Sequence, residues 1–312
     1  MFRFLITRAI GLVIVIIGVT FITFIFGYFA PGDPVRTMLG TNHYSLSLYN
    51  ALKHTYGLDL PWWQQYFNFV VNALHGSFGL SYTYAERASW DVLKDGLPYS
   101  IELGLEALAA TLLIGIPLGI LSALRTGTAT DTSITTVMML FYAIPDFVFI
   151  VGFQLLMIWL YQNSLPSLPI VGWDTWQSRI GPVLITATTG AGYFTRLTRT
   201  TVLETLGQEF VKTARGKGLR ERAVIGVHVL RYCCIPLLTI IGPSLAFIVT
   251  GIYITEALFN IPGLAYTTLQ AISLRDYPVL QASTILTCTA VVFFNALTDI
   301  AYAVADPRIR IE

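Results

Sequence analysis

Long apolar runs separated by polar segments are the main pattern along this chain. A helix needs about 20 apolar residues to cross a hydrocarbon core of ~30 Å, at about 1.5 Å per residue. Six runs reach or approach this length, at 5–29, 100–121, 135–161, 180–194, 234–253 and 279–304. Backbone polar groups find no water in lipid, so each run must be helical. The pattern predicts an all-α polytopic membrane protein with about six transmembrane helices.

The run at 180–194 has a different composition from the others. Its sequence, IGPVLITATTGAGYF, is short and rich in Thr and Gly. Small residues let helices approach closely within a membrane. We therefore expect this segment to pack between helices rather than to face lipid.

The first run separates the N-terminus from a long polar and aromatic segment. Arg3 and Arg8 precede it, as in a signal peptide, but it is longer than the roughly 7–15 apolar residues of a signal sequence. We expect it to remain as a membrane helix. The chain then divides into 1–99, an N-terminal helix with an extracytoplasmic segment, and 100–312, a transmembrane core with a cytoplasmic loop near 200–232.

Composition agrees with a membrane protein and limits the chemistry. Of the 312 residues 54% are hydrophobic and 12% charged, against roughly 45–50% and 25% in soluble domains. The net charge of +1 does not indicate a nucleic-acid partner. Cys233, Cys234 and Cys288 suit no disulfide framework, and the histidines and cysteines have no metal-ligand spacing. We expect no metal site.

Positive charge is distributed unevenly between the loops, and cytoplasmic loops are usually the ones enriched in Lys and Arg. With the N-terminus inside, the cytoplasmic segments contain Arg3, Arg8, Arg125, Arg196, Arg199, Lys212, Arg215, Lys217, Arg220, Arg222, Arg231, Arg308 and Arg310. The longer loops on the other side contain Arg36, Lys53, Arg87, Lys94, Arg179 and Arg275. This asymmetry predicts that both termini are cytoplasmic.

The stretch QEFVKTARGKGLRERAVIGVHVLR, at 208–231, holds six of the 19 Lys and Arg residues. Its place in the largest cytoplasmic loop is enough to explain the charge, but it does not explain the order of residues. Phe210, Val211 and Ala214 share one face of a short helix, and the glycines of GKG end that helix. The spacing predicts a short amphipathic helix to which another protein could bind.

KTARGKGL followed by HVLR resembles the cytoplasmic loop motif of ABC importer permeases, in the version of the oligopeptide/dipeptide/nickel group. Lys212, Thr213 and Ala214 fill the first three positions of the motif and Gly218 the seventh. The general pattern begins Glu-Ala-Ala and ends in Pro where this chain has Arg231; these departures suit the peptide/nickel version.

Further segments resemble the same group, in order and over nearly the whole chain. They are APGDP at 30–34, YGLDLPWWQQY at 56–66, GSFGLSY at 76–82, LPYSIELG at 97–104, EALFNIPGL at 256–264, RDYPVLQ at 275–281 and NALTDIAYAVADPRIR at 295–310. The long outer segment resembles the first of the two paired permease subunits in such systems.

The resemblance implies the permease subunit of an ATP-driven ABC importer in a prokaryotic cytoplasmic membrane. With a second permease it would form a path for peptides or a related small solute, delivered by an extracytoplasmic binding protein. Two separate subunits would bind ATP and Mg, because this chain has no Gly-x-x-x-x-Gly-Lys-Ser/Thr loop. We expect no cofactor and no enzymatic activity in this chain.

In this family a short helix of the cytoplasmic loop sits in a groove of the ATPase. By resemblance, the contact residues would be Glu209, Phe210, Val211, Lys212, Thr213, Ala214, Arg215, Gly216, Lys217, Gly218 and Leu219. We expect Phe210, Val211 and Ala214 to be buried in the partner, with the lysines and the arginine as rim charges.

Acidic residues in or near the predicted spans are further candidates, because ionisable groups in a membrane usually face a cavity or a partner. They are Glu102, Glu106, Asp146 and Asp299. Asp146 follows a proline near the middle of its run. We hypothesise that Asp146 lines the translocation path and attracts a cationic substrate group; the alternative is a structural hydrogen bond.

Other functions explain less of the sequence. A secondary transporter driven by an ion gradient shares the helices and the buried acids but gives no reason for the loop helix. A membrane scaffold or receptor would not depend on ATP. GPSL at 242–245 matches the Gly-x-Ser core of a serine protease, but no histidine is placed to activate Ser244.

Overall fold

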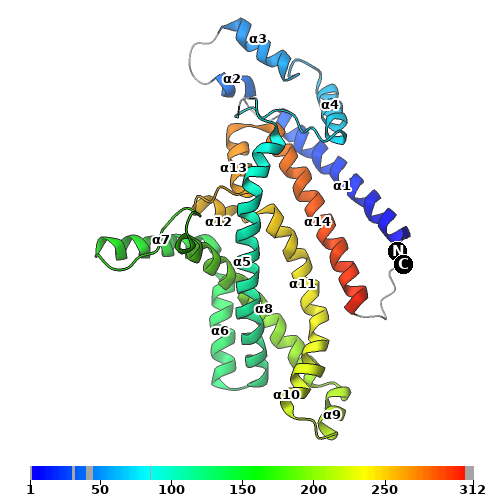
Figure 1. Cartoon of the computed structure of the whole chain (residues 1–312), viewed down its shortest axis with the longest axis vertical. Helices are drawn as coiled ribbons and strands as arrows, with labels where there is room; N and C mark the ends of the chain where they lie inside the picture. Colours follow the sequence, from blue (N-terminus) through cyan, green and yellow to red (C-terminus); the bar gives the residue numbers. More distant parts are fainter. Residues whose placement is uncertain (1, 30–31, 40–44, 85, 306–312) are drawn as a thin grey trace.

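The chain forms an elongated bundle of helices (Figure 1). The computed structural model describes residues 2–29, 32–39, 45–84 and 86–305, and the regular elements in these ranges are helices. The long ones are α1 (Phe2–Phe29), α5 (Ser89–Leu124), α6 (Ala129–Ala143), α7 (Asp146–Gln162), α8 (Trp176–Leu206), α11 (Leu230–Thr250) and α14 (Tyr277–Ala305). The predicted all-α fold is confirmed.

Four helical segments of the described chain are long and apolar enough to cross a membrane: Ile10–Phe29, Ser89–Leu124, Pro236–Leu258 and Tyr277–Ile300. They correspond to four of the predicted runs. The pair α6 and α7 meets the same requirement only when taken together, which would make five spans. The run at 180–194 lies within α8, which is not among these segments, so the sixth span stays a prediction.

The single helix predicted over 135–161 is wrong, because α6 and α7 are two helices whose axes differ by 94°. Ile144 between them has an extended backbone, with φ −85° and ψ 128°. The ring of Pro145 disfavours helical geometry in the residue before it, so α6 ends there and α7 starts in a new direction. In Figure 1, α7 points away from the other helices.

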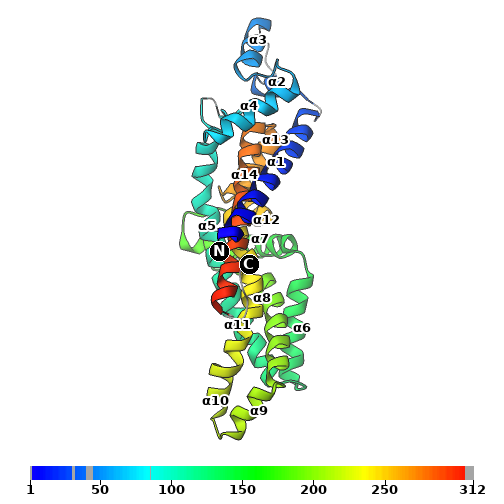
Figure 2. The ribbon, with the colours of Figure 1, turned by 90° about the vertical axis from the view of Figure 1, so that its right-hand side faces the viewer.

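The helices α5 and α8 lie side by side and form the most extensive helix pair of the structure (Figures 1 and 2). A Cβ atom added at Gly115 of α5 would lie 2.7 Å from the Cβ of Phe194, and one at Gly119 would lie 2.6 Å from the Cβ of Thr198. Only glycine permits this approach. As predicted for the run at 180–194, Ala187 and Ala191 are fully buried.

The segment predicted to be extracytoplasmic covers the ends of α1 and α14 that lie away from α9 (Figure 1). Tyr66 packs edge-on against Phe21 of α1, with ring centroids 5.3 Å apart. Asp276, which is 1% exposed, accepts hydrogen bonds from the Ser81 hydroxyl and, at 3.1 Å, from the Thr83 N–H. The short helices of this segment are α2 (Pro34–Leu39), α3 (Leu46–Thr55) and α4 (Trp62–Leu74).

A buried carboxylate holds the short helices α12 (Tyr253–Leu258) and α13 (Leu264–Leu274) against α5. Glu256 of α12 is 0% exposed. One of its oxygens accepts hydrogen bonds from Ser100 Oγ at 2.7 Å and the Ile252 N–H at 3.1 Å, and the other accepts from the Tyr266 N–H at 3.0 Å. These hydrogen bonds satisfy the buried oxygens and tie three helices together.

Candidate functional site

The predicted amphipathic helix is present as α9 (Glu209–Gly216), at one end of the molecule (Figures 1 and 2). It follows α8 directly after Gly207, with Gln208 as its N-terminal cap. The chain then reverses at Gly218, whose φ of +73° lies in the left-handed region that glycine adopts without strain. Both the helix and its glycine stop are therefore where the sequence predicts them.

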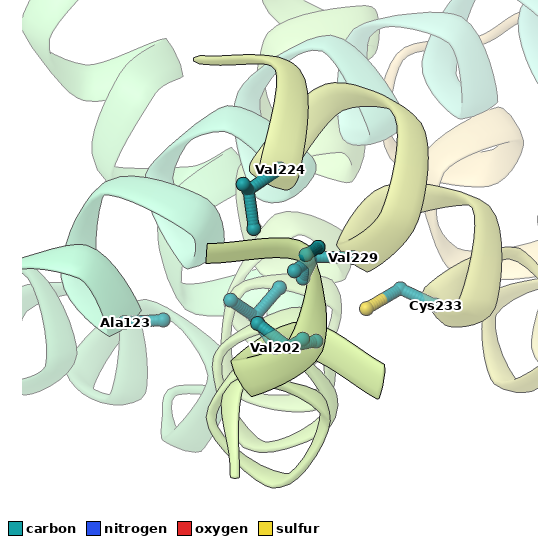
Figure 3. Close-up of a cluster of buried hydrophobic side chains, with 7 residues drawn as sticks. Ala123, Val202, Val224, Val229 and Cys233 are labelled. Atoms are coloured by element: carbon teal, nitrogen blue, oxygen red, sulfur yellow. The ribbon is translucent and has the colours of Figure 1, made fainter. Parts of the chain in front are cut away.

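The apolar side of α9 packs against the protein's own helices. Val211 is 0% exposed and Ala214 5% exposed. They belong to a cluster, which we call the valine cluster, that joins α5, α8, α9 and α11 (Figure 3). Its buried members are Ala123, Val202, Val211, Ala214, Val224, Val229 and Cys233.

This packing corrects the expectation that Val211 and Ala214 lie in a groove of a partner, because both are already covered. An amphipathic helix turns its apolar stripe toward a core, and here that core belongs to the same chain. Phe210 is 39% exposed, and the centroid of its ring lies 5.5 Å from that of Tyr232. It is the one member of the predicted apolar face that remains accessible.

The outer side of α9 is polar. We define it as the exposed face of α9, with Glu209, Lys212, Thr213, Gly216 and Lys217 as members, Lys217 being the C-terminal cap. Lys212 Nζ lies 2.8 Å from Glu209 Oε1. The remaining predicted contact residues, Arg215, Gly218 and Leu219, are also exposed. All the predicted contact residues except Val211 and Ala214 are thus accessible to a partner.

An ion pair fixes the turn after α9. Arg215 binds Glu221 of α10 (Glu221–Ala223) through two nitrogens, with distances of 2.5 Å and 3.2 Å. The hydrogen bonds from Arg215 hold the pKa of Glu221 below its usual value. Both side chains are exposed, so the pair contributes little to stability but restricts the angle between α9 and α10.

A π-helix, η1 (Val224–Val229), lies between α10 and α11 and packs against α9. Its first and last residues, Val224 and Val229, are 0% exposed and both enter the valine cluster (Figure 3). π-helices are rare and occur often at functional sites. The residue spacing in the sequence did not predict this irregular turn.

A buried acid at the same end of the molecule connects the α5–α6 turn to α8. Asp131 is 5% exposed and accepts hydrogen bonds from Ser122 Oγ at 2.5 Å and the Gly127 N–H at 3.0 Å. Arg199 binds both of its oxygens, at 2.7 and 2.8 Å. Arg199 lies about two helical turns before the end of α8. The sequence identified it only as a loop cation.

Asp146 is the first residue of α7, directly after the bend, and is half-buried. Its carboxylate makes no hydrogen bond or ion pair with any other described residue. A carboxylate in the first turn interacts favourably with the positive end of the helix dipole, which accounts for an acid at this position. Its role in translocation stays a hypothesis.

The sequence matches the family described as "Binding-protein-dependent transport system inner membrane component" over residues 115–311. Residues 1–104 match the N-terminal region, described as "Binding-prot-dependent transport system membrane comp, N-term". The chain belongs to this family. It is therefore a multi-pass inner-membrane component of an ABC importer, a transport subunit rather than an enzyme.

Relatives that match this permease over nearly its whole length are named as transport proteins. It is 32% identical over 335 residues to the dipeptide transport system permease protein DppB of Escherichia coli K12, covering 98% of each chain. It is 33% identical over 334 residues to the di/tripeptide transport system permease protein DppB of Pseudomonas aeruginosa UCBPP-PA14, again covering 98% of each. The glutathione transport system permease protein GsiC of Escherichia coli K12 is 29% identical over 310 residues, covering 99% of each.

A solved structure shares the fold. A chain of the inward-facing MetNI methionine ABC transporter superimposes with a TM-score of 0.54 at 15% identity, covering 69% of this permease and 96% of that chain.

The position of Ala214 predicts that a charge there damages this protein itself. Ala214→Glu places a carboxylate in the valine cluster, at a cost of more than about 3 kcal/mol. We expect its thermal unfolding temperature in detergent to fall by many degrees, whereas Thr213→Glu, one residue earlier on the exposed face, leaves it unchanged. An Ala214→Glu protein as stable as the wild type would contradict the burial of α9.

Proposed function

We propose that this permease is one of two paired permeases that form the translocation path of a peptide importer. The proposed cargo is supported by three relatives that match nearly the whole chain. Their names describe dipeptide, di/tripeptide and glutathione transport. The partners of the assembly are a second permease, two ATP-binding subunits that hold ATP and Mg, and an extracytoplasmic solute-binding protein. A carrier driven by an ion gradient has no comparable support.

The proposed orientation places α9 in the cytoplasm and the segment around α2 to α4 outside. The loop around α9 and the α5–α6 turn lie at the same end of the bundle (Figure 1), and both contain cations, among them Lys212 and Arg125. That clustering is the asymmetry expected for a cytoplasmic side. Arg308 and Arg310, which also entered the sequence-based orientation, lie outside the described residues.

The observation that carries the mechanism is the division of α9 into two faces. Its apolar face is anchored in the valine cluster with the ends of α5, α8 and α11, while its exposed face remains free. An ATPase subunit that contacts the exposed face and moves when ATP binds would therefore move these helices together. The permeases would then exchange between outward and inward openings, a population shift driven by nucleotide.

Charge reversal on the exposed face tests this contact. Lys212→Glu combined with Lys217→Glu should reduce ATP-driven uptake at least about tenfold, because like charges at an interface are strongly unfavourable. We expect the ATPase subunits to be lost on purification, or to hydrolyse ATP without transport. The unfolding temperature of the double variant should not change. Lys53→Glu, the same substitution on α3 and away from α9, serves as the control for uptake and assembly. Normal assembly and uptake in the double variant would remove α9 as the contact.

Asp146 provides a separate test of the path. If it lines the path and attracts a cationic group, Asp146→Asn should lower uptake of a lysine-containing dipeptide several-fold and leave uptake of dialanine nearly unchanged. If the variant takes up each peptide at the same rate as the wild type, Asp146 does not attract the substrate, and only its interaction with the helix dipole remains.

A further inference from the structure

A charged hollow lies at the opposite end of the bundle from α9. Two adjoining cavities, of about 950 Å³ and 580 Å³, share Asp174 and Arg179 in their walls. These walls come from α5 and the segment before it, from α8 and the loop between α7 and α8, and from α13 with the adjoining Pro262. We call the two cavities the outer cleft. In Figure 1, α13 and the start of α5 lie on the side away from α9, next to the short helices α2 to α4.

One part of the outer cleft is acidic and held in a fixed geometry. Arg179 lies 2.9 Å from Glu102 Oε2 and 2.9 Å from Glu106 Oε1. Trp173, which is 2% exposed, donates its indole N–H to Glu102 at 2.9 Å, and its ring centroid lies 4.8 Å from the Arg179 guanidinium carbon. The rotamers of both carboxylates are therefore set before any ligand arrives.

Arg179 does not neutralise the acids around it. The Glu102 and Glu106 side chains remain 48% and 39% exposed. Asp174 is exposed in both cavities and makes no ion pair with any described residue. Three carboxylates against one guanidinium leave this part of the cleft with a formal charge of −2.

The other part of the cleft is basic. Lys94 is exposed there and forms no ion pair within the described chain. Arg87 and Asp95 lie beside it and neutralise each other, with 2.7 Å between Arg87 Nη2 and Asp95 Oδ2. The cleft thus offers excess negative charge at one end and one unpaired ammonium at the other.

The separation of these charges matches a short peptide. Lys94 and Glu102 are eight residues apart on α5, a rise of about 12 Å, which the flexible lysine side chain can shorten. An extended chain of two or three residues spans about 7–11 Å. Tyr99, Tyr266 and Gln270 line the wall of the larger cavity and offer surface and hydrogen bonds to the peptide itself.

We propose that the outer cleft binds a short zwitterionic peptide, with its ammonium at Glu102 and Asp174 and its carboxylate at Lys94. This inference rests on the proposed peptide import and adds an entry site for the cargo. A hollow of about 950 Å³ has the size of a small-molecule site and differs from the broad, flat surface of a protein–protein contact.

Direct binding to the assembled transporter in nanodiscs, without its solute-binding protein, tests the site. The probes are dialanine, N-acetyl-dialanine, which lacks the ammonium, and dialanine amide, which lacks the carboxylate. We expect Asp174→Asn to weaken dialanine binding about three- to tenfold and to reduce the preference over the acetylated peptide. Lys94→Gln should reduce the preference over the amide instead. Lys53→Gln, in α3, is the charge-matched control for Lys94→Gln.

The outcomes separate this site from the proposed function. If the wild-type transporter with its binding protein imports dialanine, but neither variant alters binding or end-group preference, the outer cleft is not a peptide site and peptide import stands. If the assembled wild-type transporter imports none of a panel of di- and tripeptides, the proposed cargo is wrong and the inference falls with it. The site is supported if Asp174→Asn reduces the preference over the acetylated peptide and Lys94→Gln reduces the preference over the amide.

Discussion

The close packing of α5 against α8 is the constraint on which the rest of this structure depends. Lipid tails are as apolar as leucine, so helices in a membrane associate through close van der Waals contact rather than through a hydrophobic driving force. Gly115 and Gly119 allow that contact, since an added Cβ at either would lie within 2.7 Å of a side chain of α8. The same two helices carry the outer cleft at one end and lead into α9 at the other.

Polar contacts fix the register of this pair at both ends. Near α9, Asp131 at the start of α6 accepts hydrogen bonds from both Ser122 of α5 and Arg199 of α8. At the outer cleft, Arg179 of α8 binds Glu102 and Glu106 of α5. Such pairs add little energy where they are exposed, but they favour one alignment of the helices. The valine cluster then joins α9 to the same unit.

The sequence predicted those features of the fold that depend on the local pattern of apolar and polar residues. Apolar runs predicted most of the long helices. Apolar spacing identified an amphipathic α9 but not what covers its apolar face, because periodicity does not name a partner. Pro145 lies within the run at 135–161, which was predicted as one helix, because a proline alone does not specify a bend of 94°. The long-range pairings of Asp131 and Glu256 carry no local signal at all.

The most direct test measures whether α8 and the segment that it joins through the valine cluster move as one body. Spin labels would be placed at Trp176, the exposed start of α8, and at Arg222 on α10, after replacement of the native cysteines. Distances would be compared in the assembled transporter without nucleotide and with bound ATP. A second label pair, Arg222 with Phe293 on α14, should report a changed distance. The account predicts that the Trp176–Arg222 distance stays constant between the two states, and a change as large as that of the reference pair would contradict it.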